Sequence, residues 1–144
     1  MSDARAKLIN DQITCKDSGV LVDPSANAEI EGLRLLNNVT GVIVVGGPPG
    51  FGKATVERTQ VRNNRNGIYL DGQRAQIKVW YSMIDDNAGI GITATAGTFA
   101  VLNNNDISFN GMHGVLYAAG ALGSVSFNTV TMLQSALITC RAVG

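Results

Sequence analysis

The segment "GGPPGFGKAT" (46–55) carries the residues whose types and spacing most directly suggest chemistry. Gly47, Gly52 and Lys53 follow the pattern G-x-x-x-x-G-K, in which backbone N–H groups cradle phosphates and the lysine reaches them. The preceding apolar run "GVIVV" could be the buried strand that such a loop follows. The first hypothesis is therefore a nucleotide-binding P-loop over residues 47–54.

Two features of the neighbouring sequence argue against this hypothesis. A P-loop needs a hydroxyl directly after the lysine to bind magnesium, and this position is Ala54. Only 17 residues separate Lys53 from Asp71, the possible magnesium partner, which leaves little room for a helix and a parallel crossover. We therefore expect a Gly/Pro-rich loop over residues 46–53 that binds neither ATP nor GTP, with nucleotide binding as the weakest alternative.

The composition predicts one β-rich domain over residues 1–144. Hydrophobic residues make up 45% of the chain and charged residues only 15%, and the 17 glycines suit short strands joined by turns. Eleven basic and eleven acidic residues cancel, so the charge indicates neither a nucleic-acid nor a membrane partner. No residue pattern calls for a cofactor or a metal.

The start of the chain, "MSDARAKLIN", lacks the layout of a signal peptide. We expect a soluble chain that is not exported, and the sequence does not indicate its compartment. If an export signal lies outside this sequence, we expect the protein to be secreted.

An internal repeat organises nearly the whole chain. The segment "LLNNVTGVIV" (35–44) aligns with "VRNNRNGIYL" (61–70) in its apolar start, paired asparagines, glycine and alternating tail. The same frame recurs at residues 13–22, 84–93, 107–116 and 130–139. Six repeats of about 23 residues predict a solenoid of stacked parallel strands.

Three columns of apolar residues run through the six repeats and are expected to point inward. The first is Ile13, Leu35, Val61, Ile84, Ile107 and Val130. The second is Leu8, Ile30, Val56, Val79, Leu102 and Val125. The third follows a glycine column and is Val20, Val42, Ile68, Ile92, Val115 and Leu137. The oversized step, 26 residues instead of 22 or 23, lies between Leu35 and Val61, so the 46–53 loop is an insertion and Val56 points inward.

Asparagines recur at two turn positions of the repeat. Asn38, Asn64, Asn87 and Asn110 share one position, and Asn105 and Asn128 share another. We expect them to take a left-handed backbone conformation at tight bends and to stack their amides from coil to coil.

These repeats resemble right-handed parallel β-helix proteins of the pectate-lyase-like superfamily, whose coils read as apolar, Asn-Asn, Gly-Ile and apolar alternation. The resemblance covers residues 8–140 and implies an all-β, right-handed parallel β-helix of about six coils. Residues 1–10 would form an N-terminal cap, with Ser2 to Ile9 a candidate for a short capping helix.

The resemblance also suggests catalytic residues. Polygalacturonase-like relatives use paired aspartates for inverting hydrolysis, with a Gly-His-Gly nearby. Here Asp85 and Asp86 form such a pair and His113 lies in "GMHG". The alternative is that all three serve turns.

One outward face of the predicted coil could bind sugars. Its candidate binding residues are Glu31, Glu57, Lys78 and Trp80, with Phe51 from the inserted loop. An exposed tryptophan beside carboxylates and a lysine could stack on a sugar ring and bind its hydroxyls. The alternative is a solvated face with Trp80 packed under the loop against Phe51.

The shortness of the solenoid favours a small binding or structural module over a polysaccharide-acting enzyme, a glycoside hydrolase or lyase, which remains the second hypothesis. Partners are then the protein itself and a polysaccharide.

A second outward stripe predicts self-association as a homo-oligomer. It consists of Leu21, Ile43, Tyr69, Thr93, Leu116 and Ile138, of which five are apolar or aromatic. The cysteines are expected to be free, because Cys15 and Cys140 would lie about 24 Å apart along the stack.

Overall fold

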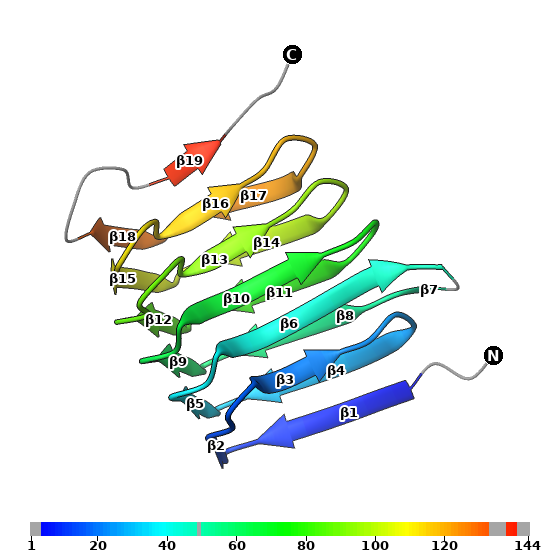
Figure 1. Cartoon of the computed structure of the whole chain (residues 1–144), viewed down its shortest axis with the longest axis horizontal. Coiled ribbons are helices and arrows are strands. Elements are labelled where there is room, and N and C mark those ends of the chain that lie inside the picture. Colours follow the sequence, from blue (N-terminus) through cyan, green and yellow to red (C-terminus); the bar gives the residue numbers. More distant parts are fainter. Residues whose placement is uncertain (1–3, 49, 133–137, 141–144) are drawn as a thin grey trace.

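A computed structural model describes residues 4–48, 50–132 and 138–140 of the chain. Within these residues the chain is all-β and winds as a solenoid of six coils, each giving one strand to each of three parallel sheets (Figure 1). The predicted fold class is therefore confirmed. No helix in the described part has the length and apolar character needed to cross a membrane.

We name the three sheets A, B and C in the order in which each coil enters them. Sheet A contains β1 (Ala4–Ile9), β4 (Ala26–Glu31), β8 (Lys53–Glu57), β11 (Gln76–Trp80), β14 (Phe99–Asn103) and β17 (Leu122–Ser126). Sheet B contains β2 (Gln12–Ile13), β5 (Arg34–Leu36), β9 (Gln60–Arg62), β12 (Met83–Asp85), β15 (Asp106–Asn110) and β18 (Thr129–Met132). Sheet C contains β3 (Ser18–Val22), β6 (Thr40–Gly47), β10 (Asn66–Asp71), β13 (Ile92–Ala94), β16 (Val115–Tyr117) and β19 (Ile138–Cys140).

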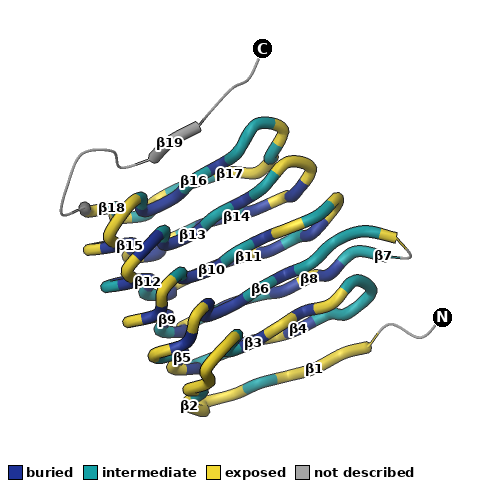
Figure 2. The backbone as a smooth tube through the Cα atoms, viewed as in Figure 1, coloured by how far each residue is buried: buried dark blue, intermediate teal, exposed yellow. Residues whose placement is uncertain are grey.

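The strand register confirms the first two predicted columns in all six coils and the third in five. Val56 pairs with Ile30 on one side and Val79 on the other, and is fully buried. Val61 and Ile68 hold the corresponding places in sheets B and C. Stacked like residues fill the axis of the solenoid with Ile, Leu and Val, and burial is deepest in the middle coils (Figure 2).

The capping helix considered for Ser2 to Ile9 is absent from the part of this segment that the structure describes. Ala4–Ile9 is instead strand β1, paired in parallel with β4 from Ala4–Ala26 to Ile9–Glu31. Alanine, lysine and leucine favour a helix locally, but six residues are too few for a stable one, and β4 offers a complete row of backbone partners.

The register predicted for the sixth coil is wrong by one residue in sheet C. Val115 pairs with Ile138, not with Leu137, and Leu116 pairs with Thr139. Leu137 lies outside the described residues. Ile138 therefore belongs to the register of the inward column rather than to the outward stripe.

The loop over residues 46–53 is a β-hairpin at the corner between coils two and three. Gly46 and Gly47 at the end of β6 pair antiparallel with β7 (Gly50–Phe51). The chain then enters strand β8 at Lys53, as the register predicted, where a P-loop would begin a helix.

The first turn position forms an amide ladder through the middle of the molecule, as predicted. The Nδ2 groups of Asn38, Asn64 and Asn87 each donate to the Oδ1 of the next asparagine, at 2.9, 3.1 and 2.9 Å. That same Oδ1 also accepts the backbone N–H of the preceding asparagine. All four asparagines are buried.

A second ladder joins sheets A and B with a changing side chain. It runs from Thr59 through Ser82 and Asn105 to Asn128, and each backbone N–H donates to the side-chain oxygen of the next coil. Asn105 and Asn128 thus share a turn position, as predicted, but the threonine and serine were not recognised as their equivalents.

The left-handed conformation does not fall on the ladder asparagines. It falls on the residue before each one, such as Asn63 (φ 54°) before Asn64 and Asn104 (φ 53°) before Asn105. This residue makes the bend, and the ladder residue then points its amide inward to satisfy backbone groups.

Candidate functional site

The outward surface of sheet A, here called the sheet A face, carries three columns of side chains. The first column is Arg5, Asn27, Lys53, Gln76, Phe99 and Leu122. The middle column is Lys7, Glu29, Thr55, Lys78, Val101 and Ser124. The last column is Ile9, Glu31, Glu57, Trp80, Asn103 and Ser126. Glu31, Glu57, Lys78 and Trp80 therefore lie together on one face, as expected from the alternation of buried and outward residues.

The carboxylates of the sheet A face are already paired. Arg58, in the turn after β8, lies 3.2 Å from Glu31 and 3.0 Å from Glu57. Glu29 lies 3.8 Å from Lys7. These exposed pairs contribute little stability, but they neutralise the acidic residues of the face.

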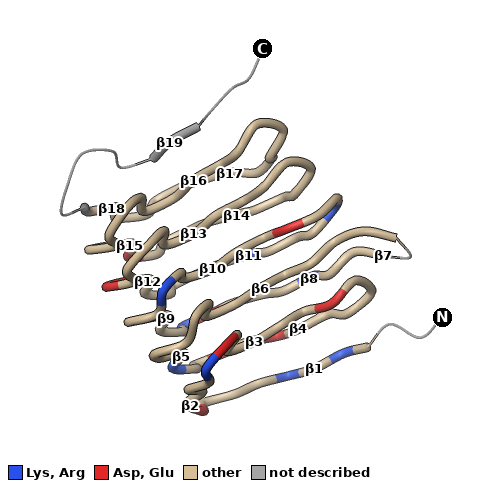
Figure 3. The backbone as a smooth tube through the Cα atoms, viewed as in Figure 1, with Lys and Arg blue, Asp and Glu red and all other residues tan. Residues whose placement is uncertain are grey.

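The other two lysines of this face, Lys53 and Lys78, have no such partner. Lys78 Nζ lies 5.7 Å from the ring centroid of Trp80, and Lys53 Nζ lies 4.7 Å from that of Phe51. In the described part of the chain, no carboxylate lies within ion-pair distance of either lysine. Charged residues are few and scattered along the coils (Figure 3). Because Glu29, Glu31 and Glu57 are paired and Lys53 and Lys78 are not, the uncompensated charge of this region is positive.

A shallow pocket of about 250 Å³ opens on the same face. Its lining comes from four neighbouring coils and consists of Asn27, Lys53, Ala54, Thr55, Gln76, Ile77, Lys78 and Phe99. Two amides, two ammonium groups and a hydroxyl thus surround it. The indole Nε1 of Trp80, one column away, is buried without a hydrogen-bond partner.

The structure does not bring Phe51 to Trp80. Phe51 lies before the start of β8, whereas Trp80 pairs with Glu57 at the end of that strand. The rise of four residues along β8, from Lys53 to Glu57, alone separates the backbone positions of Phe51 and Trp80 by about 13 Å. The expected packing of Trp80 against Phe51 is therefore wrong, because the inserted segment forms a hairpin at the corner instead of folding over the sheet.

Asp85 and Asp86 lie at the end of β12, where both contact Arg62. Arg62 Nε lies 3.3 Å from Asp85 Oδ2, and its Nη2 lies 2.6 Å from Asp86 Oδ2. The Asp85 side chain is only 8% exposed, and its Oδ1 is buried without a partner. Asp86 has φ 52° and occupies the left-handed turn position before Asn87. The pair thus serves a turn and an ion-pair cluster.

Burial raises the pKa of the Asp85 carboxyl above its usual range. The Arg62 guanidinium opposes this effect, while Asp86 and Asp106 add to it. The two adjacent aspartates therefore differ in environment, one buried and tending to hold a proton and one ion-paired at the surface.

His113 lies in the next coil, at the turn that leads into β16. Its backbone carbonyl accepts a hydrogen bond from Gly91 N at 2.9 Å, and its ring Nδ1 is buried without a partner. Among the described residues, no hydrogen bond or ion pair joins His113 to Asp85 or Asp86. In coil five the left-handed place of Asp86 is taken by Phe109, so the aspartate is not a fixed feature of this turn.

The residues expected to form an interface lie in one row on sheet C. Leu21 pairs with Ile43, Ile43 with Tyr69, and the row continues through Thr93 to Leu116. Leu21 is exposed and the other four are half-buried. The row excludes Ile138, whose place beside Leu116 is taken by Thr139.

Comparison with protein families supplies the assignment that this geometry suggests. A family model described as a right handed beta helix region matches residues 2–141. The chain belongs to the right-handed β-helix family. Comparisons with curated proteins and with solved structures give no match.

A right-handed β-helix places its functional side chains on the outside of the coil, so the family does not by itself assign a site. In the described part of this β-helix, no three His, Cys, Asp or Glu side chains gather where they could hold a metal ion. Cys15 is free and exposed in the first coil, as expected. The side chain of Cys140 lies outside the described residues.

Sequence reasoning missed several residues of this β-helix that the structure places at the candidate sites. Arg62 and Arg58 bind the expected carboxylates, and Asn27, Gln76 and Phe99 line the pocket. The repeat held a signal for one of them, because the register that stacks Val61 on Ile84 also stacks Arg62 on Asp85.

The raised pKa of Asp85 predicts a pH-dependent effect of Asp85→Asn. Because the pKa of Asp85 is raised in the folded state, folding favours its protonated form. The contribution of Asp85 to the free energy of unfolding therefore rises as the pH falls from above the folded-state pKa to the unfolded-state pKa of about 4. The melting temperature of the asparagine variant minus that of the parent should therefore be larger at pH 7 than at pH 5. Thermal unfolding at both pH values measures this, with the exposed Asp71→Asn as control. An equal difference at both pH values would contradict it.

Proposed function

We propose that this β-helix is a carbohydrate-binding module whose binding surface is the sheet A face. The observation that carries the proposal is the pocket on this face, where Lys53 and Lys78 share a lining with the amides of Asn27 and Gln76 and the hydroxyl of Thr55. Trp80 lies one column away, half-buried, with its ring beside Lys78.

Physical chemistry supports sugar as the ligand of such a surface. Sugars present hydroxyls that accept and donate hydrogen bonds, and C–H faces that stack on aromatic rings. The flat sheet A face supplies donors on parallel strands about 4.8 Å apart, so one extended chain could contact several coils. Because Glu31 and Glu57 are held by Arg58, the groups left to meet a ligand are the lysines, the amides and Trp80.

A glycan array tests this proposal, with Trp80→Ala as the decisive variant. The parent should bind at least one glycan class, and the variant should lose about tenfold in affinity or more, since it lacks the stacking ring and its cation–π contact with Lys78. Tyr81→Asn is the matched control. Tyr81 is an exposed aromatic one residue away, and its left-handed position is filled by Asn104 in the next coil. Absence of binding by the parent, or equal loss in both variants, would refute the assignment.

A polysaccharide-acting enzyme is the second candidate, favoured by one observation. Burial raises the pKa of Asp85, which has an unpartnered oxygen and lies beside a second carboxyl, and a carboxyl whose pKa is raised by burial can serve as a general acid. Hydrolysis or eliminative cleavage of any glycan that binds, abolished in Asp85→Asn, would favour the enzyme. Binding without turnover favours the module.

We also propose that the protein self-associates through the sheet C row of Leu21, Ile43, Tyr69 and Leu116. Four of the five side chains in this row are apolar or aromatic, with Thr93 between Tyr69 and Leu116, and a monomer would leave the row partly in water. Light scattering should report a dimer or larger species for the parent and a monomer for Ile43→Lys with Leu116→Lys. Thr93→Lys places a single charge in the same row and should lower the degree of association less than the double variant does. A monomeric parent at high concentration would end this proposal.

A further inference from the structure

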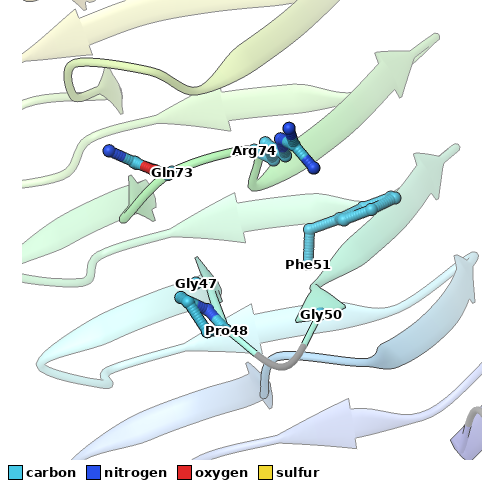
Figure 4. Close-up of a pocket in the computed structure, with 6 residues that line it drawn as sticks. All are labelled: Gly47, Pro48, Gly50, Phe51, Gln73 and Arg74. Carbon is cyan, nitrogen blue, oxygen red and sulfur yellow. The ribbon is translucent and has the colours of Figure 1, made fainter.

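A second pocket lies at the corner where the inserted hairpin meets the next coil. It has a volume of about 350 Å³ and is lined by Gly47, Pro48, Gly50, Phe51, Gln73 and Arg74. Figure 4 shows Phe51 and Arg74 projecting from neighbouring coils, while the Gln73 side chain points away from both. The register explains their proximity, because each precedes by two residues a member of the Lys53–Gln76 pair.

Close backbone approach fixes the base of this pocket. A Cβ on Gly72 would collide with the carbonyl of Gly46, and a Cβ on Gly46 would meet the backbone of Gln73 and Ala75. The hairpin therefore rests directly on the loop that carries Arg74, and Gly47, with open space around it, faces outward. Among the described corners, the insertion between coils two and three alone forms such a hairpin.

Arg74 has a backbone conformation that an arginine adopts at a cost. Its φ is 65°, and its N–H donates to the carbonyl of Gly97, which occupies the same place in the next coil. Gly97 in turn donates to Gly120, and both glycines have φ 79°. Glycine fits this position without strain, so an arginine here stores backbone strain, which is common where a side chain has a function.

The charges around the pocket are positive and uncompensated. Lys53 lies over the Phe51 ring at 4.7 Å, on the coil next to Arg74. In the described residues, neither Arg74 nor Lys53 lies within ion-pair distance of a carboxylate. Arg74 lines the pocket itself, whereas Lys53 does not line it but holds its ammonium against the Phe51 ring, which does. An anion bound between these two exposed cations would be attracted by both.

We propose that this corner pocket binds an oxyanion, a phosphate, sulfate or carboxylate group, between the guanidinium of Arg74 and the ammonium of Lys53. Guanidinium offers a planar fork of donors that matches an oxyanion, and the lysine adds a second point charge. The Phe51 ring forms an apolar wall and holds Lys53 through the cation–π contact. This proposal is separate from the carbohydrate proposal because Arg74 and Phe51 lie outside the pocket of the sheet A face, although Lys53 also lines that pocket.

Titration with inorganic phosphate and with sulfate, followed by amide chemical shifts, tests this inference on the full chain. Saturable shifts should appear at Gly47, Gly50 and Arg74, with a dissociation constant on the order of 1 mM from two charge-assisted contacts. A parallel arm with glucuronate, sulfated and neutral monosaccharides shows whether the group can be carried by a sugar. Shifts with the acidic sugars but not with the inorganic ions assign the site to a substituent of a glycan.

Arg74→Gly separates binding from folding. Because glycine fits the left-handed backbone, this variant should melt about 3 °C higher than the parent while its oxyanion affinity falls about tenfold or more. Arg74→Lys should retain part of the affinity. Arg34→Gln, which removes an exposed arginine on β5, is the matched control and should bind as the parent does.

Two results would overturn the proposal. One is the absence of saturable shifts with every oxyanion tested. The other is shifts of similar size at Arg34 and Arg65, unchanged by Arg74→Gly, which would show nonspecific screening of surface cations.

Discussion

Asn87→Ala is expected to lower the free energy of unfolding by about 4 kcal/mol, a large part of the stability of a domain of this size. The Asn87 amide accepts from the backbone N and the Nδ2 of Asn64 at 3.0 and 3.1 Å. It also donates to Val61 O at 3.0 Å and to Asn110 Oδ1 at 2.9 Å. Asn87 is buried, so removal of its amide takes a hydrogen-bond partner from interior groups of the coil before it and the coil after it.

Urea unfolding followed by circular dichroism measures this loss. Asn63→Gly is the control, since Asn63 lies in the same turn but is exposed and has φ 54°, which glycine adopts freely. The control should remain within about 0.5 kcal/mol of the parent. A loss below about 1 kcal/mol for Asn87→Ala would mean that water enters the ladder and replaces the amide.

Gly67→Ala should destabilise the protein by about 3 kcal/mol through a different mechanism. Gly67 belongs to the glycine column at the start of sheet C, where the coils approach closely. An added Cβ would collide with the carbonyl of Gly91 in the next coil and lie 3.0 Å from Cγ2 of the buried Ile84. To relieve this steric clash, two coils would have to separate in the middle of the stack, where close packing makes a backbone shift unfavourable.

The matched control for this variant is Gly97→Asn. Gly97 has φ 79°, and a Cβ added there would make only ordinary van der Waals contacts, the nearest at 3.5 Å. Asparagine also tolerates the left-handed region, so the loss of stability should stay below about 1 kcal/mol. Equal midpoints for Gly67→Ala and the parent in the urea titration would show that the close approach at Gly67 is not required.

The inward columns and the amide ladder could be predicted from the sequence because each depends on a repeated, local rule. Val56, Val61 and Ile68 must each match the coil above and below, so a shift by one residue would expose an entire strand. Six aligned repeats constrain that choice strongly. The family match over residues 2–141 agrees with this fold.

The terminal coils were less predictable because only one neighbour constrains them. The segment that forms β1 contains good helix formers, and only its pairing with β4 decides for a strand. In coil six the glycine column ends at Ala136, and both Leu137 and Ile138 are apolar, so the sequence pattern allowed either register. The structure selects Ile138 as the partner of Val115.

For the candidate sites, the alternation of strands predicts which side chains share a face but not which charges pair. Glu57 and Trp80 were placed together correctly. Arg58 forms ion pairs with Glu57 and Glu31 from a turn position where its own backbone is left-handed, and the sequence pattern did not reveal that position. The length of the insertion likewise did not show that it would fold as a hairpin at the corner and keep Phe51 away from Trp80.

The direction of the asparagine ladder has a consequence for synthesis on the ribosome. The backbone N–H groups of Asn38, Asn64 and Asn87 each donate to the side chain of the asparagine one coil later in the chain. In a coil that has just emerged from the ribosome, this backbone N–H therefore has no side-chain acceptor until about 23 further residues have been synthesised. Folding of the nascent chain must then advance from the N-terminus one coil behind translation, and a pause in translation leaves the most recent coil incomplete.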